Sequence, residues 1–412
     1  DLHSIDSKVG RATLMRKIAV MTGTRADYGL LKNLIAELNN KASGLNRTLE
    51  LQIIATGSHL SAEHGMTVAE IRRDGYEPAA EIPIWSSEDT SLAAAVDTGE
   101  AIAKFARELD RLRPDVVVVL GDRLEAFAMA SAATILTIPV AHIHGGELTL
   151  GAMDDSLRHA ITKLSFLHFT TTDEHRNRVI QLGEEPSRVF NYGAPVLDAI
   201  ANLELLSREA IEDKFKVRFG TKNTVLMTFH PAAFDEASAK TMIGELLAAM
   251  EALTSPLDPA ETQLIVTGTN NDIGSADVRE AIASFVARLP DRVSYVESFG
   301  QLGYLSVMKQ VNLVTGNSSS TVLEAPVLGV PSVIVGNRQE GRPMSASVIK
   351  PARAERVLIL EAMQKALDPA FRASAAAAGT PFGVPGFAQK ATVELMRHEI
   401  PSPPKKKFWS AN

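Results

Sequence analysis

The stretch GDRLEAFAMASAATILTIPVAHIHGGELTLGAMDDSLRHAITK, residues 121–163, decides the fold. An apolar run leads into it at 116–120, and a second one lies inside it at 138–143. Both runs predict buried strands, and ionisable residues follow each of them directly, as GDR and as HGGE. A helix start, DDSLRH, comes next. Because open parallel sheets bind their ligands beyond the carboxyl ends of the strands, this layout predicts an active site.

The composition is that of an ordinary globular protein with two domains. The 412 residues are too many for one ordinary core, 45% of them are hydrophobic and 22% are charged. The net charge of −7 argues against a nucleic-acid-binding protein, which usually carries a basic patch. The basic cluster Lys405 to Lys407 lies near the end of the chain, and we interpret it as a solvated tail.

Several kinds of segment and site find no support in the sequence. The chain has no cysteine, which excludes disulfides, thiolate metal sites and a cysteine nucleophile and fits a reducing compartment. The longest apolar stretch, 126–141, contains polar residues and a proline and does not predict a membrane span. Residues 1–14 lack the apolar region of a signal peptide, so we interpret them as an extension before a start near Met15.

Apolar, β-branched runs alternate with longer helical patterns, which is typical of parallel sheets in α/β proteins. The alternation predicts two Rossmann-like, doubly wound domains that face each other across a cleft, at 16–198 and 199–383, and a final helical segment, 384–400, that packs back on the first domain. The predicted strands are 18–21, 51–55, 116–120, 140–144, 166–170, 189–191, 224–229, 263–267, 293–297, 312–315 and 332–335. The predicted helices include 30–38, 91–111, 125–133, 156–163 and 391–400.

Two loops after predicted strands have the composition of a phosphate site. In the first, Gly23 to Gly29, the amino end of the following helix and Arg25 suit an anion. This loop matches neither the dinucleotide fingerprint nor the Walker A pattern, so NAD and ATP are poor candidates. A plain strand–turn–helix junction with a surface arginine is the structural alternative.

The second loop, Gly316 to Thr321, is rich in hydroxyl groups. Ser318 and Ser319 could hold a diphosphate, and Glu324 could accept hydrogen bonds from ribose hydroxyls. Helix capping by serine is the structural alternative. Further candidates for the same crevice are Arg338, His230, and the aromatic residues Phe299 and Tyr304, which could stack on a base or belong to the core.

Carboxylates, histidines and an arginine follow the strands of the first half. Asp122 ends a predicted buried strand, where a carboxylate has few structural reasons to be. On the predicted helix, Asp154 and Arg158 are four residues apart and share a face, so they form either a surface ion pair or an aimed carboxylate; the same holds for Asp155 and His159. A metal site is conceivable, but its residues match no zinc spacing, and we expect none. Those residues are His142, His144, Glu147 and Asp154.

Together these motifs resemble the hydrolysing UDP-N-acetylglucosamine 2-epimerases of sialic acid biosynthesis and their relatives in legionaminic acid biosynthesis. The matching segments lie between Thr22 and Arg342 and are TGTRADYGLL, ATGSHLSAEHG, LGDRLE, AHIHGGE, DDSLRHAITKLSFLHF, VIQLGE, FHP, GNSSST and GNRQEGR. The resemblance implies a glycosyltransferase-B-like architecture with the nucleotide on the second domain. Two positions depart from many relatives: His144 replaces a carboxylate of the mammalian-type pattern, and Leu30 replaces a lysine.

By motif match, the resemblance also implies roles for individual residues. The catalytic candidates are Asp122, His144, Glu147, Asp154 and, in support, Arg158. The substrate-binding candidates are Arg25, Asp27, His59, His230, Phe299, Ser318, Ser319, Glu324 and Arg338. Which member of the catalytic group takes the proton stays open.

The chemistry implied by the resemblance is elimination followed by hydration, which gives UDP and free N-acetylmannosamine. It needs no cofactor. Three alternatives stay open: the same chemistry on a UDP-linked 2,4-diacetamido-2,4,6-trideoxy sugar or a GDP-linked sugar, an acceptor-dependent glycosyltransferase, and a nucleotide-sugar sensor. We expect a nucleotide-sugar substrate, no nucleic acid or membrane partner, and a homodimer or homotetramer in the cytoplasm.

Overall fold

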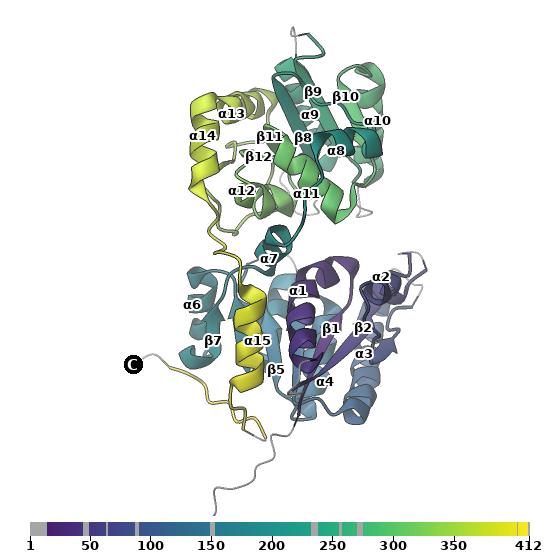
Figure 1. Ribbon diagram of the computed structural model, residues 1–412, viewed down its shortest axis with the longest axis vertical. Helices are drawn as coiled ribbons and strands as arrows, with labels where there is room; N and C mark the ends of the chain where they lie inside the picture. The colour runs from purple at the N-terminus through teal and green to yellow at the C-terminus, as the bar shows by residue number, and fades with distance from the viewer. Residues whose placement is uncertain are drawn as a thin grey trace, which may run out of the picture. The chain divides into compact units, whose positions relative to one another are not determined.

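Two α/β units make up the protein in its computed structural model (Figure 1). The structure describes residues 15–43, 49–62, 65–86, 90–148, 153–231, 238–254, 258–269, 275–401 and 403–410. The first unit consists of the described residues within 1–147, 153–199 and 384–412, and the second of those within 148–152 and 200–383. Each unit carries one parallel sheet, so the predicted fold class is confirmed.

The sheet of the first unit has the strand order β3-β2-β1-β4-β5-β6-β7. Its strands are β1 (Arg16–Thr22), β2 (Leu49–Thr56), β3 (Ala80–Ile82), β4 (Val116–Leu120), β5 (Val140–Ile143), β6 (Leu167–Thr170) and β7 (Val189–Asn191). The connecting helices are α1 (Arg25–Ser43), α2 (Val68–Arg73), α3 (Ser91–Leu112), α4 (Leu124–Ile135), α5 (Met153–Leu164), α6 (Asp173–Gln181) and α7 (Pro195–Ala201), with single turns η1 (Gly57–Leu60) and η2 (Pro186–Arg188). The order reverses between β1 and β4, the kind of point where such sheets bind ligands.

Helices bury both faces of this sheet. Successive side chains of a strand point to opposite faces, so each strand contributes to two cores. Ile18 and Val20 of β1 pack into a core with α1 and with α15 (Phe387–Arg397). Ala19 and Met21 of the same strand pack into a second core with α3 and α4. This arrangement explains why β1 and β4 are continuous apolar runs rather than alternating ones.

The last helix, α15, belongs to the first unit and lies beside α1 (Figure 1). The buried carboxylate of Asp198 caps it, accepting hydrogen bonds from the backbone N–H groups of Gly386, Phe387 (3.2 Å) and Ala388 (2.7 Å). This cap makes α15 start four residues before the predicted 391, and the helix ends at Arg397 rather than at 400.

The sheet of the second unit has the order β10-β9-β8-β11-β12-β13, with its reversal between β8 and β11. Its strands are β8 (Asn223–Thr228), β9 (Thr262–Thr267), β10 (Val293–Val296), β11 (Leu313–Gly316), β12 (Ser332–Ile334) and β13 (Val348–Ile349). Its helices are α8 (Arg208–Phe215), α9 (Ala239–Thr254), α10 (Ser275–Arg288), α11 (Gly300–Gln310), α12 (Glu324–Val327), α13 (Arg356–Leu367) and α14 (Pro369–Ala378), with the single turn η3 (Ser319–Thr321). A buried core joins this sheet to α9, α10 and α13.

Every predicted strand is present, with ends shifted by up to two residues, but the two short edge strands β3 and β13 were missed. They have three and two residues, too few to show a periodic pattern. The start of α1 was also predicted wrongly, at 30 instead of Arg25. Thr24 explains the earlier start, because its side chain accepts from the N–H of Asp27 at 3.1 Å and its carbonyl from that of Tyr28 at 3.0 Å.

Among the helices of the described segments, none is long and apolar enough to cross a membrane.

Candidate active site

Arg158 on α5 joins the ionisable residues that follow β4 and β5. Its guanidinium forms an ion pair with the Asp122 carboxylate just beyond β4, and it donates to the carbonyl of His144 at 3.0 Å. A carboxylate oxygen of Glu147 lies 3.9 Å from the same guanidinium. Only 5% of the Arg158 side chain is exposed, so these charges interact where water screens them little. The structure thus brings four of the predicted catalytic residues together.

His144 and Glu147 form a hydrogen-bonded pair in the loop after β5. The Nδ1 atom of His144 lies 2.7 Å from Oε1 of Glu147, and the Nε2 atom is buried without a hydrogen-bond partner among the described residues. His144 has a backbone φ of +67°, a left-handed conformation that is rare for residues other than glycine. Such a conformation persists only where the surroundings enforce it, which is frequent in active sites.

The loop is held by two residues that the sequence did not single out, Thr171 just before α6 and His175 in α6. The Thr171 hydroxyl donates to Glu147 Oε1 at 3.1 Å and lies 2.8 Å from Nδ1 of His175. Burial lowers the pKa of His175 to about 4, so this ring is neutral at physiological pH. Gly146 is required in the loop, because a Cβ there would lie 2.3 Å from the carbonyl oxygen of His175.

His142 on β5 is a structural residue. Its ring nitrogens lie 2.7 Å from the carbonyl oxygen of Gly121 and 3.2 Å from the hydroxyl of Thr162, and it is fully buried. Burial lowers its pKa to about 3. Both nitrogens are thus engaged. Within the described segments, no group of three or more histidines and carboxylates has the geometry to hold a metal ion.

Asp154 lies exposed at the start of α5. Desolvation by its surroundings raises its pKa, and the negative charge of Asp122 adds to the rise. Its neighbour Asp155 is engaged with His159, with 3.4 Å between Oδ2 and Nε2. Asp154 is therefore the member of the helix's acidic pair that adjoins the Arg158 cluster.

The candidates Arg25 and Asp27 lie in the first turn of α1, just after β1, and the candidate His59 lies in η1, just after β2. Arg25 is exposed and pairs with Glu70 of α2 at 3.0 Å. Burial, together with the charge of Glu125, raises the pKa of Asp27 to about 6. His59 is fully buried, with its nitrogens 2.9 Å from the Thr22 hydroxyl and 2.8 Å from that of Thr67. The structure therefore gives His59 the role of fixing the turn from within.

A chain of hydroxyl groups runs along the carboxyl ends of the strands of the second unit. It links Thr267, Thr228, Tyr304, Ser320 and Ser318 through oxygen–oxygen distances of 2.9, 3.0, 2.8 and 3.0 Å. Glycine is required at position 316, where the backbone approaches that of Thr228 closely: its φ is +125°, and a Cβ there would lie 1.9 Å from the Thr228 carbonyl oxygen. The Ser318 side chain also caps η3, while the half-buried Ser319 hydroxyl has no partner in the described part of the chain.

His230 is held by a residue that the sequence did not single out. The buried Asn317 side chain accepts from the His230 N–H at 2.8 Å and donates to the His230 carbonyl at 2.6 Å. The His230 ring lies 3.4 Å from the Thr269 hydroxyl. His230 is thus fixed just beyond β8, beside the loop that begins at Asn317.

Glu324 and Arg342 each present a buried polar atom, Oε2 and Nη1, without a hydrogen-bond partner in the described segments. Burial raises the pKa of Glu324 to about 7, and the Arg342 charge opposes the rise. Arg338 is half-buried in the loop between β12 and β13. Polar atoms that are buried and unsatisfied within a protein are the ones that a ligand can satisfy.

The rings proposed for base stacking belong to the interior. Phe299 is 6% exposed and packs edge-on against Phe215, with ring centres 4.8 Å apart. The Tyr304 hydroxyl takes part in the hydroxyl chain, and burial raises its pKa to about 12. Both residues therefore fit the core interpretation, and base stacking by either ring stays a prediction.

The first unit carries a cluster of charged acid–base groups, and the second unit carries a hydroxyl-rich loop that suits an anion. The family described as UDP-N-acetylglucosamine 2-epimerase matches residues 42–396. The chain belongs to this family.

Relatives in the 2-epimerase family match most of the chain. It is 35% identical over 334 residues to the GDP/UDP-N,N'-diacetylbacillosamine 2-epimerase (hydrolyzing) of Campylobacter jejuni, covering 81% of this chain and 84% of that protein. It is 34% identical over 337 residues to the polysialic acid biosynthesis protein P7 of Escherichia coli, covering 81% and 82%. Its fold is similar to the crystal structure of UDP-GlcNAc 2-epimerase from Neisseria meningitidis bound to UDP-GlcNAc, with a TM-score of 0.76, 19% identity, and coverage of 93% and 100%.

Proposed function

We propose that this member of the 2-epimerase family is a hydrolysing enzyme that converts UDP-N-acetylglucosamine and water into N-acetylmannosamine and UDP. One observation carries the proposal: Asp122, His144 and Glu147 meet on the buried Arg158, and His144 Nε2 is left without a partner among the described residues. Family membership supports the same chemistry.

The reaction needs two acid–base groups, because the C2 proton leaves one face of the sugar and returns on the other. In the neutral His144 ring, donation from Nδ1–H to Glu147 leaves the lone pair on Nε2. We assign proton transfer at C2 to this atom and to Asp122, with Glu147 orienting the histidine. Removal of the proton expels UDP from C1 and gives a glycal, and water then adds at C1 while C2 is protonated on the opposite face.

The departing UDP must be stabilised as it gains charge, which is the task of preorganised donors. The second unit supplies suitable groups in the amides and hydroxyls of Ser318 and Ser319 and in the cations of Arg338 and Arg342. We assign Glu324 to the ribose hydroxyls, since its unpaired oxygen suits that role. Arg25, Asp27 and His230 complete the proposed substrate contacts, whereas His59 and Phe299 act from the interior.

A second substrate, a UDP-linked 2,4-diacetamido-2,4,6-trideoxy sugar, is favoured by a specific observation. The Campylobacter jejuni relative, at 35% identity, is named for N,N'-diacetylbacillosamine. The proton at C2 and the leaving group at C1 are the same in both sugars, so the proposed roles of the residues do not change. A GDP-linked sugar is the third substrate to compare.

The deciding experiment incubates the purified protein with each of these nucleotide sugars in D₂O and identifies the products by NMR. The proposal expects UDP and a free sugar with deuterium at C2, formed without any sugar acceptor. Release that requires an acceptor would identify a glycosyltransferase, and protium retained at C2 would exclude elimination. Binding without turnover would identify a sensor.

We also propose that the protein serves nonulosonic acid biosynthesis in the cytoplasm as a homodimer or homotetramer. The name of the Escherichia coli relative supports the pathway class, and the absence of cysteine fits a reducing compartment. Light scattering of the purified protein measures the oligomeric state; a monomer at micromolar concentration contradicts this part of the proposal.

A further inference from the structure

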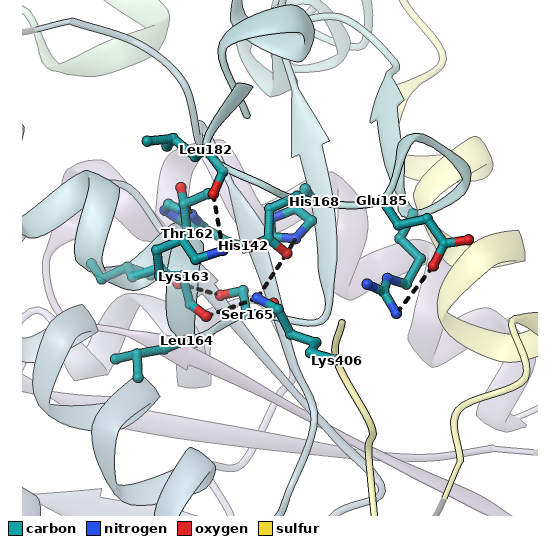
Figure 2. A network of polar contacts seen from close by, with 12 residues as sticks. His142, Thr162, Lys163, Leu164, Ser165, His168, Leu182, Glu185 and Lys406 are labelled. Carbon is teal, nitrogen blue, oxygen red and sulfur yellow. Dashed lines mark hydrogen bonds and ion pairs between the residues drawn. The ribbon is translucent and has the colours of Figure 1, made fainter. Parts of the chain in front are cut away.

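The end of the chain is built into the first unit, contrary to the expectation of a solvated tail. Lys405 and Lys407 are exposed, but the Lys406 side chain is only 21% exposed. Its ammonium nitrogen lies 2.7 Å from the carbonyl oxygens of Lys163 and Ser165, which Figure 2 shows beside it. It also lies 2.7 Å from a carboxylate oxygen of Glu184. An ammonium group has three N–H donors, so all of them are used.

Two aromatic residues after Lys406 hold the tail in place. The Trp409 N–H donates to the Gly183 carbonyl at 2.9 Å, and the Phe408 ring lies 4.9 Å from the Lys163 ammonium. Phe408 packs directly on Gly183, where a Cβ would come within 2.4 Å of the ring. Residues 406–409 thus contact the first unit at Lys163 and Gly183, while Phe408 and Trp409 stay 71% and 41% exposed.

Lys406 pairs with two kinds of group that are costly to leave without a partner: the carbonyls at the end of α5 and the buried carboxylate of Glu184. Lys163 and Ser165 lie at the carboxyl end of α5, whose last carbonyls lack partners within the helix and favour a cation. Glu184 is fully buried, and its other partners are Lys163 at 2.6 Å and His168 at 3.0 Å. Burial acts to raise the pKa of Glu184, but His168, Lys163 and Lys406 outweigh it and lower the pKa to about 2.

Two routes connect this lysine to the acid–base cluster. The first is α5 itself, which carries Lys163 in its last turn and Arg158 near its middle. The second passes through His168, whose register partner on the neighbouring strand is His142. The Nε2 atom of His142 in turn lies 2.7 Å from the carbonyl oxygen of Gly121, the residue before Asp122. Both routes end at the ion pair of Arg158 with Asp122.

We propose that Lys406 is a positioning residue for the epimerase reaction: from the end of the chain it fixes the carboxyl end of α5 and Glu184, and thereby the geometry of the Arg158–Asp122 pair. This inference rests on the proposed function. It predicts that Lys406 affects the chemical step rather than nucleotide binding, because the hydroxyl-rich loop that we assign to UDP belongs to the second unit.

The test replaces Lys406 by alanine and compares it with the matched variants Lys405→Ala and Lys407→Ala. We expect kcat to fall about 10- to 100-fold in Lys406→Ala, the cost of a small misplacement of reacting groups, with KM and UDP affinity unchanged. Ethylammonium ions should restore part of the activity in a saturable way, and tetramethylammonium at the same ionic strength should not. The two control variants should keep the full kcat.

Hydrogen exchange of the backbone in residues 153–164 provides a readout that does not depend on activity. Exchange there should quicken in Lys406→Ala, slow again with ethylammonium, and stay unchanged in the controls. If the unaltered protein turns over no nucleotide sugar, the proposed function fails, and this exchange alone decides the link from Lys406 to α5. Unchanged kcat and exchange in Lys406→Ala overturn the inference, as does a loss of activity that follows thermal unfolding and that ethylammonium does not restore.

Discussion

The two units carry different chemical groups at the carboxyl ends of the same kind of sheet. In the first unit, polar residues gather beyond β4 and β5, next to the reversal of strand order between β1 and β4. In the second unit, they gather beyond β8 and β11, between which the order reverses. The first unit collects charged groups around the buried Arg158, whereas the second collects neutral hydroxyls and amides around Gly316. Charge in a poorly screened site suits proton transfer, and fixed neutral donors suit a bound anion. The difference predicts that catalysis and nucleotide binding can be impaired separately.

The largest effect is expected from the acid–base groups of the first unit. Asp122→Asn and His144→Gln should each lower kcat by roughly 10²–10⁴, the usual range for removing an acid–base group. Calorimetry should find UDP affinity nearly unchanged. Asp155→Asn is the matched control, since this carboxylate is engaged with His159 on the same helix. Equal losses of kcat in Asp155→Asn would show that the helix, not the cluster, is responsible.

Arg158→Met should be the most destabilising of these substitutions, because it leaves the Asp122 carboxylate without its cation. Breaking a buried pair costs about 3–5 kcal/mol, and the Arg158 side chain is only 5% exposed. Urea unfolding monitored in the first unit measures the change. The control is Arg73→Met, whose side chain is 73% exposed and 3.7 Å from Glu70. A shift no larger than that of the control would mean that Arg158 is not the centre of the cluster.

The strands that end at the two candidate sites could be predicted from the sequence. Several groups that orient the residues of these sites could not. Apolar runs that end in GDR and HGGE predicted the ends of β4 and β5. A buried parallel strand is a continuous apolar run, so it can be recognised without knowing which strands pair with it. Nothing local in the sequence indicates that Thr171 bonds Glu147, that Asn317 clamps His230 or that Asp198 caps α15. These contacts join residues far apart in the chain and arise only when the elements pack.

The same reason accounts for the error over the tail. A run of three lysines has no periodicity that marks the middle one, so composition alone predicts that all three are solvated. Only folding brings the buried carboxylate of Glu184 and two carbonyls at the end of α5 within hydrogen-bond distance of Lys406.

The buried acid of the second unit should give a pH-dependent stability. Burial raises the pKa of Glu324 from an ordinary 4.5 to about 7, so between these values the folded protein binds more protons than the unfolded one. Stability from this group is therefore full below pH 4.5 and is lost as the pH rises to 7, by no more than about 3 kcal/mol. Glu324→Gln should remove that slope. Parallel pH profiles of unfolding for both proteins would contradict the assignment.

A smaller effect is expected in nucleotide binding. Replacing Ser318 and Ser319 together by alanine should weaken UDP by about 1–3 kcal/mol, the cost of lost hydrogen bonds to a charged partner. At saturating substrate, kcat should change little, opposite to the outcome for Asp122. Ser284→Ala, on the exposed side of α10, serves as the control. If calorimetry finds unchanged UDP affinity in the double variant, these serines only cap η3.

The smallest effect is expected from chelation. The charge of the diphosphate can be met by Arg338, by the loop amides around Ser318, and by Arg342, whose Nη1 has no hydrogen-bond partner among the described residues. The reaction as proposed therefore requires no divalent ion. Both nitrogens of His142 are engaged by Gly121 and Thr162, which removes it from the ligands that the sequence offered to a metal. We expect the same kcat and KM after incubation with EDTA and gel filtration into metal-free buffer. Activity lost in this treatment and restored by Mg²⁺, Mn²⁺ or Zn²⁺ would mean that an ion shares the work assigned to the arginines. In that case the nucleotide site would contain a bound cation beside the leaving diphosphate, and it could no longer be described as a site of neutral donors and arginines alone.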